Sequence, residues 1–443
     1  MWLFLLAQPV TRRSLDAALP CTGTDVLVEL GLVCEGPGAQ VAALLDLRPH
    51  AGAGKDGPGW WVVSDLGETA TGAPLPEQHV LGIGSASLTL AAATVRRPGA
   101  RVLDLGTGSG VQALHAAAHA RQVVATDVSA RALRLAALTL RINGLQDRVE
   151  LRRGDLLEPV AGERFDLVVS NPPFVITPRR GDVPAMQYRD GGLAGDEVVR
   201  RLVTGLGEHL EPGGIAQLLG NWEIPAGRSW DERVEQWVQE SGLDAWVVQR
   251  EVMDPAEYAE LWIRDGGVSA GQRYEALYAA WLDDLAARDV EAVGLGMILL
   301  RRPGPGTRAL RRLEDVRGST SGALGAHLDR CLVGHDALAG DDDGLLGQRL
   351  RVAADVTEER HHRPGQGDPE VIVLRQGGGL GRAARVGTAV AAVVGACDGE
   401  LALGQIAGAV AALLEQPADD VVGHLLPAVR NLVLDGVLSP LTR

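Results

Sequence analysis

The stretch Arg101-Val-Leu-Asp-Leu-Gly-Thr-Gly-Ser-Gly-Val111 decides the fold of the central part of the chain. A short apolar run leads into three glycines at alternate positions, Gly106, Gly108 and Gly110, and then into an alanine-rich segment. Glycine lacks a Cβ, so a turn of this kind can bend sharply and let a ligand approach the backbone. The pattern predicts a strand, a turn and a helix, with a cofactor bound at the turn.

The spacing separates this turn from the dinucleotide-binding pattern G-x-G-x-x-G, which would need glycine in place of Val111. The strand ends in an acid, Asp104, and the next apolar run ends in another, Asp127. A third run, starting at Val149, leads to Asp155. Successive βα units return to one edge of a parallel sheet, so these acids are expected close together, with Asp127 able to accept both hydroxyls of a ribose.

A fourth apolar run, residues 165–170, ends in the tetrapeptide Asn171-Pro172-Pro173-Phe174. Each proline fixes its own φ and lacks an N–H donor, so the tetrapeptide is preset in shape and leaves its oxygens free of competition. A Pro-Pro loop that merely ends a strand is the alternative interpretation. The three preceding strand ends favour a functional role.

These four strand ends resemble the class I S-adenosylmethionine-dependent methyltransferases of the small-methyltransferase type. The tetrapeptide resembles the N/D-P-P-Y/F signature of enzymes that methylate nitrogen in a planar group. The resemblance is specific over residues 80–222 and extends along nearly the whole chain to uncharacterised actinobacterial methyltransferases with winged-helix-like flanking domains. It implies an α/β fold with a Rossmann-like seven-stranded sheet, and S-adenosylmethionine as cofactor. Those relatives carry additional residues before the part that matches Met1, so we expect the N-terminal module to be incomplete.

The resemblance also implies roles for cofactor-binding residues. Asp104 would anchor the turn and help to hold the amino-acid end of the cofactor, and Asp155 would contact the adenine amino group. The small residues before the helix near position 87 would meet the cofactor carboxylate from the far side, or would only cap that helix. The expected cofactor set is Gly84, Ser85, Asp104, Gly106, Thr107, Gly108, Gly110, Asp127, Val128, Asp155, Leu156 and Asn171.

Catalysis follows from the chemistry of the acceptor. The lone pair of an amide, guanidine or base-amine nitrogen is delocalised, so two acceptors must pull on its hydrogens. By resemblance these are the side-chain oxygen of Asn171 and the carbonyl of Pro172, on a loop stiffened by Pro173. Phe174 would stack on the substrate plane or lie beside the sulfonium. Phenylalanine here departs from the glutamine-modifying branch, which carries tyrosine. We expect direct in-line transfer with no metal.

Two further segments are candidate substrate contacts. Tyr188, Arg189 and Asp190 follow the tetrapeptide in a polar, glycine-rich stretch. An Arg189 that faced the pocket would favour a substrate carboxylate, whereas an Arg189–Asp190 network would only fix the loop. Asn221 and Trp222 come just after the predicted fifth strand, at the edge where open α/β sheets bind ligands.

Three functions remain open from the sequence. The first is N-methylation of a small molecule, amino acid or peptide. The second is N-methylation of a base in RNA or DNA, which a net charge of −15 disfavours because nucleic-acid binding rests on clustered basic residues. The third is a methyltransferase-like fold recruited for another amine alkylation or cyclisation, or as a scaffold subunit, in a biosynthetic complex. A protein partner could bind the flanking modules.

The 443 residues divide by pattern into a winged-helix-like module over residues 1–59, a catalytic domain over 60–302 and a mostly helical, winged-helix-like domain over 303–443. The first module is expected to contain helices at 3–7, 11–19 and 24–31 and a strand at 41–47. The last is expected to contain a strand at 370–374 and helices at 383–396, 402–414 and 421–435.

The apolar start, residues 1–7, is too short to span a bilayer and lacks the features of a targeting signal, so we expect a cytoplasmic protein. His115 and His119 stand four residues apart but have no acidic partner of the HExxH type, and we interpret them as a surface pair. The four cysteines are scattered without CxxC pairing, which predicts free thiols.

Overall fold

The computed structural model describes residues 2–52, 59–181, 183, 186–268, 271–305, 308–318, 322 and 324–441. Contacts within the chain define two compact units. One consists of Met1–Ala91, Arg97–Arg302 and Arg311–Asp315, and the other of Ala92–Arg96, Pro303–Leu310 and Val316–Arg443. The division into three modules over 1–59, 60–302 and 303–443 remains a proposal.

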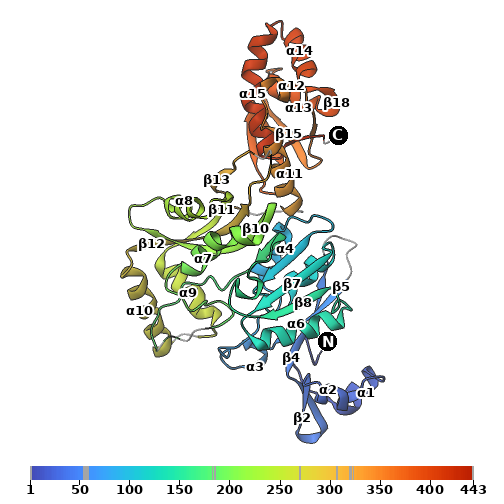
Figure 1. The fold of residues 1–443 in the computed structure, drawn as a ribbon, viewed down its shortest axis with the longest axis vertical. Coiled ribbons are helices and arrows are strands. Elements are labelled where there is room, and N and C mark those ends of the chain that lie inside the picture. Colours follow the sequence, from blue (N-terminus) through green and yellow to red (C-terminus); the bar gives the residue numbers. More distant parts are fainter. Residues whose placement is uncertain are drawn as a thin grey trace. The chain divides into compact units, whose positions relative to one another are not determined.

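In the part of the chain that the structure describes, eight strands form the central sheet, in the order β13-β11-β12-β10-β9-β6-β7-β8 (Figure 1). Their bounds are β6 Arg101–Leu105, β7 Gln122–Asp127, β8 Val149–Arg153, β9 Phe165–Ser170, β10 Leu210–Pro225, β11 Asp244–Met253, β12 Val290–Arg301 and β13 Arg311–Asp315. Each of the seven strands expected from the sequence is present, and the Rossmann-like α/β fold is confirmed.

The strand order places a topological switch between β6 and β9. From β6 the chain continues outward to β7 and β8, and then returns to the other side of β6 as β9. These four strands are parallel, so the carboxyl ends of β6 and β9 diverge around a crevice, which is where open α/β sheets bind ligands. All four predicted strand ends therefore meet at one edge of the sheet.

Helices connect and cover these strands. They are α4 Ser85–Ala93, α5 Val111–Ala117, α6 Ala130–Ile142, α7 Glu197–Gly205, α8 Trp230–Ser241, α9 Pro255–Asp265 and α10 Gln272–Ala286. α6 shows how the sequence sets such an element. Ser129 caps its first turn by accepting a hydrogen bond from the Ala132 N–H at 3.3 Å, and Gly144, with φ 69°, allows the chain to leave the helix.

The eighth strand lies beyond the expected end of the catalytic domain. The chain leaves the sheet after β12 and returns as β13, which pairs in parallel with β11 from Ala245↔Arg311 to Gln249↔Asp315. The boundary expected between residues 302 and 303 therefore precedes one more strand of the same sheet. A five-residue strand with a largely polar sequence carries too little periodicity to be predicted.

The N-terminal part contains α1 Arg12–Ala18 and α2 Gly23–Glu29 with a small sheet of β1 Val10–Thr11, β2 Val33–Gly36 and β3 Gln40–Ala43. The helix expected at residues 3–7 is wrong, because residues 2–6 form turns closed by the Gln8 N–H on the Trp2 carbonyl at 2.9 Å. A hairpin of β4 Leu45–Ala51 and β5 Gly59–Asp65 follows, and the Val63 N–H on β5 donates to the Thr139 hydroxyl of α6 at 3.0 Å.

The second unit contains α11 Leu324–Ala337, α12 Asp342–Leu346, α13 Thr388–Gly395, α14 Leu403–Leu413 and α15 Ala418–Leu434 with six short strands among its described residues. The helix expected at 383–396 begins later, because residues 383–386 pair with β16 Val371–Gln376 as strand β17. The stretch between the helices expected at 383–396 and 402–414 contains a strand, β18 Asp398–Ala402, which pairs with β14 Arg349–Val352.

Candidate active site

The glycine turn has the geometry that its sequence predicts. Gly106, Gly108 and Gly110 all adopt positive φ, at 76°, 55° and 89°. The N–H groups of Gly106 and Thr107 both donate to the Thr126 carbonyl at 2.9 Å, which fixes the turn to the neighbouring strand. Gly110 is the N-cap of α5, and a side chain there would be strained because of its φ.

Asp127, at the end of β7, closes the turn from the other side. Its two carboxylate oxygens accept backbone hydrogen bonds from Gly108 at 2.9 Å and from Ser129 at 2.8 Å. Burial raises the pKa of this carboxyl, and the two backbone donors oppose that rise. Each oxygen keeps further acceptor capacity, so the residue can also bind the hydroxyls of a ribose.

Asp104 lies beneath the turn and does not line the cleft. It is 1% exposed and accepts a hydrogen bond from the Thr107 hydroxyl at 2.6 Å. Burial raises the pKa of Asp104 to about 7. Asp104 is therefore placed to anchor the turn through Thr107. Direct contact of its carboxylate with a cofactor would require the turn to change conformation.

The loop after β8 forms the next wall. Asp155 and Leu156 line the cleft, and Leu156 has a φ of 41°, which a residue with a side chain rarely adopts. Strained backbone of this kind is concentrated at ligand-binding sites because the surrounding structure must hold it in place. Its neighbour Gly154 is required by packing, since a Cβ there would lie 2.4 Å from Pro159 Cγ.

The tetrapeptide begins on the cleft wall. Asn171, Pro172 and Pro173 line it, directly after Ser170, whose hydroxyl donates to the Leu105 carbonyl at 2.8 Å. Asn171 Oδ1 is shielded from solvent and has no hydrogen-bond partner within the described residues. The Pro172 carbonyl already accepts the Phe174 N–H at 2.8 Å and retains one lone pair.

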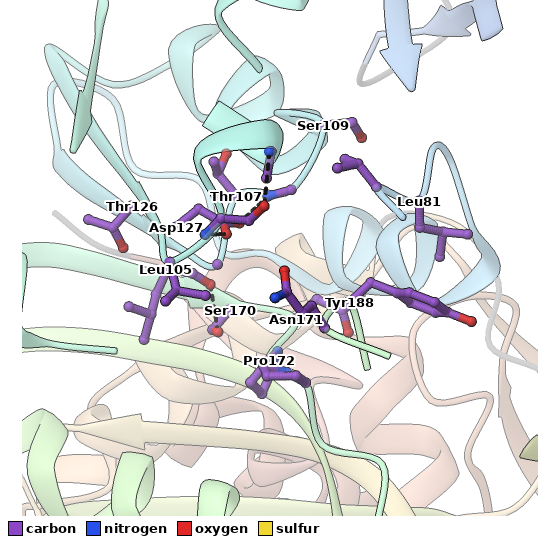
Figure 2. Close-up of a pocket in the computed structure, with 18 of the residues that line it drawn as sticks. Leu81, Leu105, Thr107, Ser109, Thr126, Asp127, Ser170, Asn171, Pro172 and Tyr188 are labelled. Atoms are coloured by element: carbon purple, nitrogen blue, oxygen red, sulfur yellow. Dashed lines mark hydrogen bonds between the residues drawn. The ribbon is translucent and has the colours of Figure 1, made fainter. Parts of the chain in front are cut away.

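Figure 2 shows the cleft with Thr107 and Asp127 on one side and Asn171, Pro172 and Tyr188 on the other. Of the expected cofactor residues, Gly84, Ser85, Asp104 and Gly110 are not among those that line it. α4 contributes Ser87 instead, and the segment before it contributes Leu81 and Gly82. The cleft is also lined by residues that the sequence did not indicate as cofactor or substrate contacts: His79, Val80, Leu105, Ser109, Val111, Gln112, Thr126, Ser129, Ala132, Gly154, Ser170 and Gln187.

One of these missed residues could have been found from the sequence. Gln112 stands in the first turn after the glycines, and its side chain donates to the Ser87 carbonyl at 2.7 Å. It thereby ties α5 to α4 at the mouth of the cleft. A polar residue in the first turn of a largely apolar helix is the signal that was available.

The candidate substrate residues separate into two groups. Tyr188 lines the cleft, but Arg189 and Asp190 are turned away from it and bind other residues. Arg189 Nη1 donates to Asp265 Oδ2 at 2.8 Å and to the Trp262 carbonyl at 2.6 Å. Asp190 is paired with Arg179. Arg189 does not line this cleft and is not paired with Asp190, because each charge has a different partner supplied by the tertiary fold.

Three further candidates lie inside the protein. Trp222 is fully buried in the core of the sheet, where its indole N–H donates to Gln249 Oε1 at 3.1 Å. Asn221 is also fully buried, and its amide donates to the Tyr258 hydroxyl at 2.7 Å. Phe174 is partly buried between two core clusters and does not line the cleft. β10 runs to Pro225 and is therefore longer than expected, which places positions 221 and 222 within the sheet.

The histidine interpretation is also corrected. His115 is buried, and its Nε2 lies 2.8 Å from Nε2 of His50 on β4. His115 and His119 do not form a surface pair, because the hairpin covers this face of α5.

Within the described ranges, no helix has both the length and the hydropathy needed to cross a membrane.

The strand order, the glycine turn and the Asn-Pro-Pro-Phe loop define a class I S-adenosylmethionine-dependent methyltransferase domain. Residues 80–241 match the family model described as "Methyltransferase small domain". Residues 335–440 match a second model, described as a domain of unknown function (DUF7782).

Curated proteins similar to this chain are methyltransferases. A ribosomal protein uL3 glutamine methyltransferase from Bradyrhizobium diazoefficiens is 43% identical over 26% of this chain and 38% of its own length. A release factor glutamine methyltransferase from Xylella fastidiosa is 38% identical over 37% of this chain and 61% of its own length. A ribosomal RNA small subunit methyltransferase C from Alcanivorax borkumensis is 37% identical over 29% of this chain and 34% of its own length. The chain thus spans between about a third and three fifths of the length of these relatives.

These relatives overturn one expectation. From the sequence we expect a small-molecule or peptide acceptor and consider nucleic acid unlikely, but the relatives are named for a ribosomal protein, a release factor and ribosomal RNA. The expectation rested on net charge. Net charge averages over a whole surface on which many acids are paired with arginine, so it does not report on the charge near one cleft.

Proposed function

We propose that the protein transfers a methyl group from S-adenosylmethionine to a planar nitrogen of a macromolecule, with the side-chain amide of a protein glutamine as the first candidate. The observation that carries the proposal is Asn171 Oδ1, a shielded acceptor without a partner in the described part of the chain, on the wall of the cleft. A buried acceptor left unpaired destabilises a protein by about 1–3 kcal/mol. A substrate N–H that binds to this oxygen removes that free-energy cost.

The residues that would hold the cofactor form the opposite wall. The turn at Gly106 to Gly108 would receive its amino-acid end, Asp127 its ribose hydroxyls, and Asp155 with Leu156 its adenine. When bound, S-adenosylmethionine supplies an electrophilic methyl group. The shielded carboxyl of Asp104 and the bonds of the turn to Thr126 keep this wall in shape before the ligand arrives.

The tetrapeptide would act on the acceptor. Asn171 Oδ1 accepts one hydrogen of the nitrogen, and the remaining lone pair of the Pro172 carbonyl accepts the other. Both hydrogen bonds raise the electron density on the nitrogen, so its lone pair is more nucleophilic toward the methyl group. With the cofactor bound, the nitrogen would form a bond to the methyl carbon as the bond from that carbon to sulfur breaks, which leaves a neutral thioether, and the methylated nitrogen would lose one proton to solvent. The prolines fix their own φ angles, so the Pro172 carbonyl is held in place before the substrate binds.

Relatives of two kinds support different acceptors. The glutamine methyltransferases favour a protein amide. The ribosomal RNA enzyme favours a second candidate, the exocyclic amine of an RNA base, whose two hydrogens fit the same pair of acceptors. In that case the base would have to leave its stack to enter the cleft.

The test begins with calorimetric titration of the full chain with S-adenosylmethionine. The protein is then incubated with methyl-labelled cofactor and, separately, with ribosomal proteins, release factors and ribosomal RNA. Digests are analysed by mass spectrometry for N-methylglutamine and for N-methylated bases. Label in N-methylglutamine supports the first candidate, and label in a base supports the second. Binding of the cofactor without transfer to any fraction contradicts the proposal and favours a recruited, non-methylating fold.

A further inference from the structure

Tyr188 occupies the place on the cleft wall that the tetrapeptide was expected to fill with an aromatic ring. Among the described residues that line the cleft, it is the one tyrosine, and neither phenylalanine nor tryptophan accompanies it. The imidazole of His79 is the other ring there, packed edge-on to Tyr188 with the two centroids 5.8 Å apart. The cleft therefore offers one phenol ring as a flat apolar surface.

Backbone pairing explains why Tyr188 and not Phe174 has this position. Phe174 forms an antiparallel bridge with Asp190, and the Val175 N–H donates to the Arg189 carbonyl at 2.8 Å. The segment that carries Tyr188 therefore runs back alongside the tetrapeptide. Figure 2 shows Tyr188 beside Asn171, with Pro172 below them. The ring of Phe174 packs into the core clusters instead.

The ring of Tyr188 is held at its hydroxyl end. Its hydroxyl donates to Asp265 Oδ2 at 2.8 Å, and the same oxygen accepts Arg189 Nη1 at 2.8 Å. The Arg189 guanidinium lies 5.7 Å from the centroid of the Tyr188 ring. Asp265 is the last residue of α9, so a helix of the sheet's own unit fixes the ring. A ring fixed before binding loses little conformational entropy when a planar group packs on it.

We propose that Tyr188, fixed by Asp265, is the specificity-determining residue for the acceptor, and that the planar group bearing the nitrogen packs on its ring while Asn171 accepts the N–H. This inference rests on the proposed function and names the residue that selects a flat acceptor within it. Amide and base planes both suit an aromatic face, whereas a tetrahedral amine has no face to present.

The test uses full-length protein and the fraction, among ribosomal proteins, release factors and ribosomal RNA, that the wild type methylates. Tyr188→Ala removes the ring, Tyr188→Phe keeps the ring but loses the bond to Asp265, and Phe174→Leu removes the ring of the tetrapeptide. Tyr274→Ala is the matched control, because Tyr274 is a partly buried tyrosine stacked on Tyr278 outside the cleft.

We expect Tyr188→Ala to raise the KM for the acceptor about tenfold, Tyr188→Phe to raise it no more than about threefold, and Tyr274→Ala to leave it unchanged. The affinity for S-adenosylmethionine, measured by calorimetry, should be the same in all four variants. Melting temperatures identify any variant that is only misfolded.

An unchanged KM in Tyr188→Ala would overturn the inference, and so would an equal loss in Tyr188→Ala and Tyr188→Phe, which would show that the hydroxyl bond and not the ring matters. A rise in KM confined to Phe174→Leu would return the role to the tetrapeptide. These results are distinct from failure of the proposed function, in which the wild type itself neither binds the cofactor nor transfers label.

Discussion

Asp127 Oδ2 accepts the backbone N–H of Gly108 at 2.9 Å, so the carboxyl end of the second parallel strand is bonded directly to the glycine turn of the first. The bond joins two features that are separated in the sequence and have different expected tasks, the turn for the amino-acid end of the cofactor and the acid for its ribose. A single substitution at Asp127 should therefore affect both.

We predict that Asp127→Ala weakens binding of S-adenosylmethionine by about ten- to a hundredfold, since hydrogen bonds to charged groups contribute about 1.5–3 kcal/mol each. The measurement is calorimetric titration, with circular dichroism to confirm that the sheet remains folded. Asp147→Ala, at an exposed acid between α6 and β8, is the control and should bind as the wild type does. Equal affinity in Asp127→Ala and the wild type would contradict the assignment.

Asn171→Ala should have the opposite effect on the two ligands. The side chain acts on hydrogens of the acceptor, so kcat should fall by about 10²–10³ while the dissociation constant of the cofactor changes less than about twofold. Single-turnover transfer of labelled methyl groups, together with calorimetry, separates the two quantities. A full rate in the variant would show that the shielded Oδ1 has no part in the reaction.

Asp104 should make the stability of the free protein depend on pH. Burial raises its pKa from an ordinary value of 3.8 to about 7, so the folded state holds the proton more tightly than the unfolded chain. The contribution of this group to the free energy of unfolding of the wild type is therefore fully present at low pH, and it decreases as the pH rises from about 4 to about 7. The asparagine side chain of the Asp104→Asn variant cannot ionise, so the variant does not lose this stability as the pH rises.

The melting temperature of Asp104→Asn relative to the wild type should consequently rise between pH 5 and pH 8. Differential scanning calorimetry at both pH values, without cofactor, measures it, and other titrating groups cancel in the comparison. The amide oxygen can still accept the Thr107 hydroxyl, which keeps the turn intact. A difference that is the same at both pH values would show that Asp104 ionises normally.

Trp222→Phe tests whether the buried tryptophan has only a structural role. Loss of the hydrogen bond to Gln249 and of packing volume should destabilise the protein by about 1–3 kcal/mol, as followed by denaturant unfolding. The KM for the acceptor should not change at temperatures where the variant is folded. A higher KM without loss of stability would restore Trp222 as a substrate contact.

The elements that the sequence predicted best are those whose signal is local. The turn at Gly106 to Gly110 needs positive φ, and Asn171 to Phe174 needs two prolines after a strand, so the residues themselves show where each begins. The errors arose where the position of a side chain depends on a distant partner. Trp222 was placed beyond the end of a strand that continues to Pro225, and Arg189 was assigned to substrate without knowledge of Asp265.

By itself the sequence determined seven of the strands, the edge of the sheet where their ligand-binding ends gather, and the place of the tetrapeptide at the end of the fourth, because hydrophobic periodicity, glycine and proline act through the chain's own backbone. Only the tertiary structure decided which aromatic ring faces the cleft. Phe174 packs into the core and Tyr188 lies beside Asn171 because two segments pair as antiparallel chains and α9 supplies a carboxylate, and contacts between residues so far apart leave no pattern in one sequence.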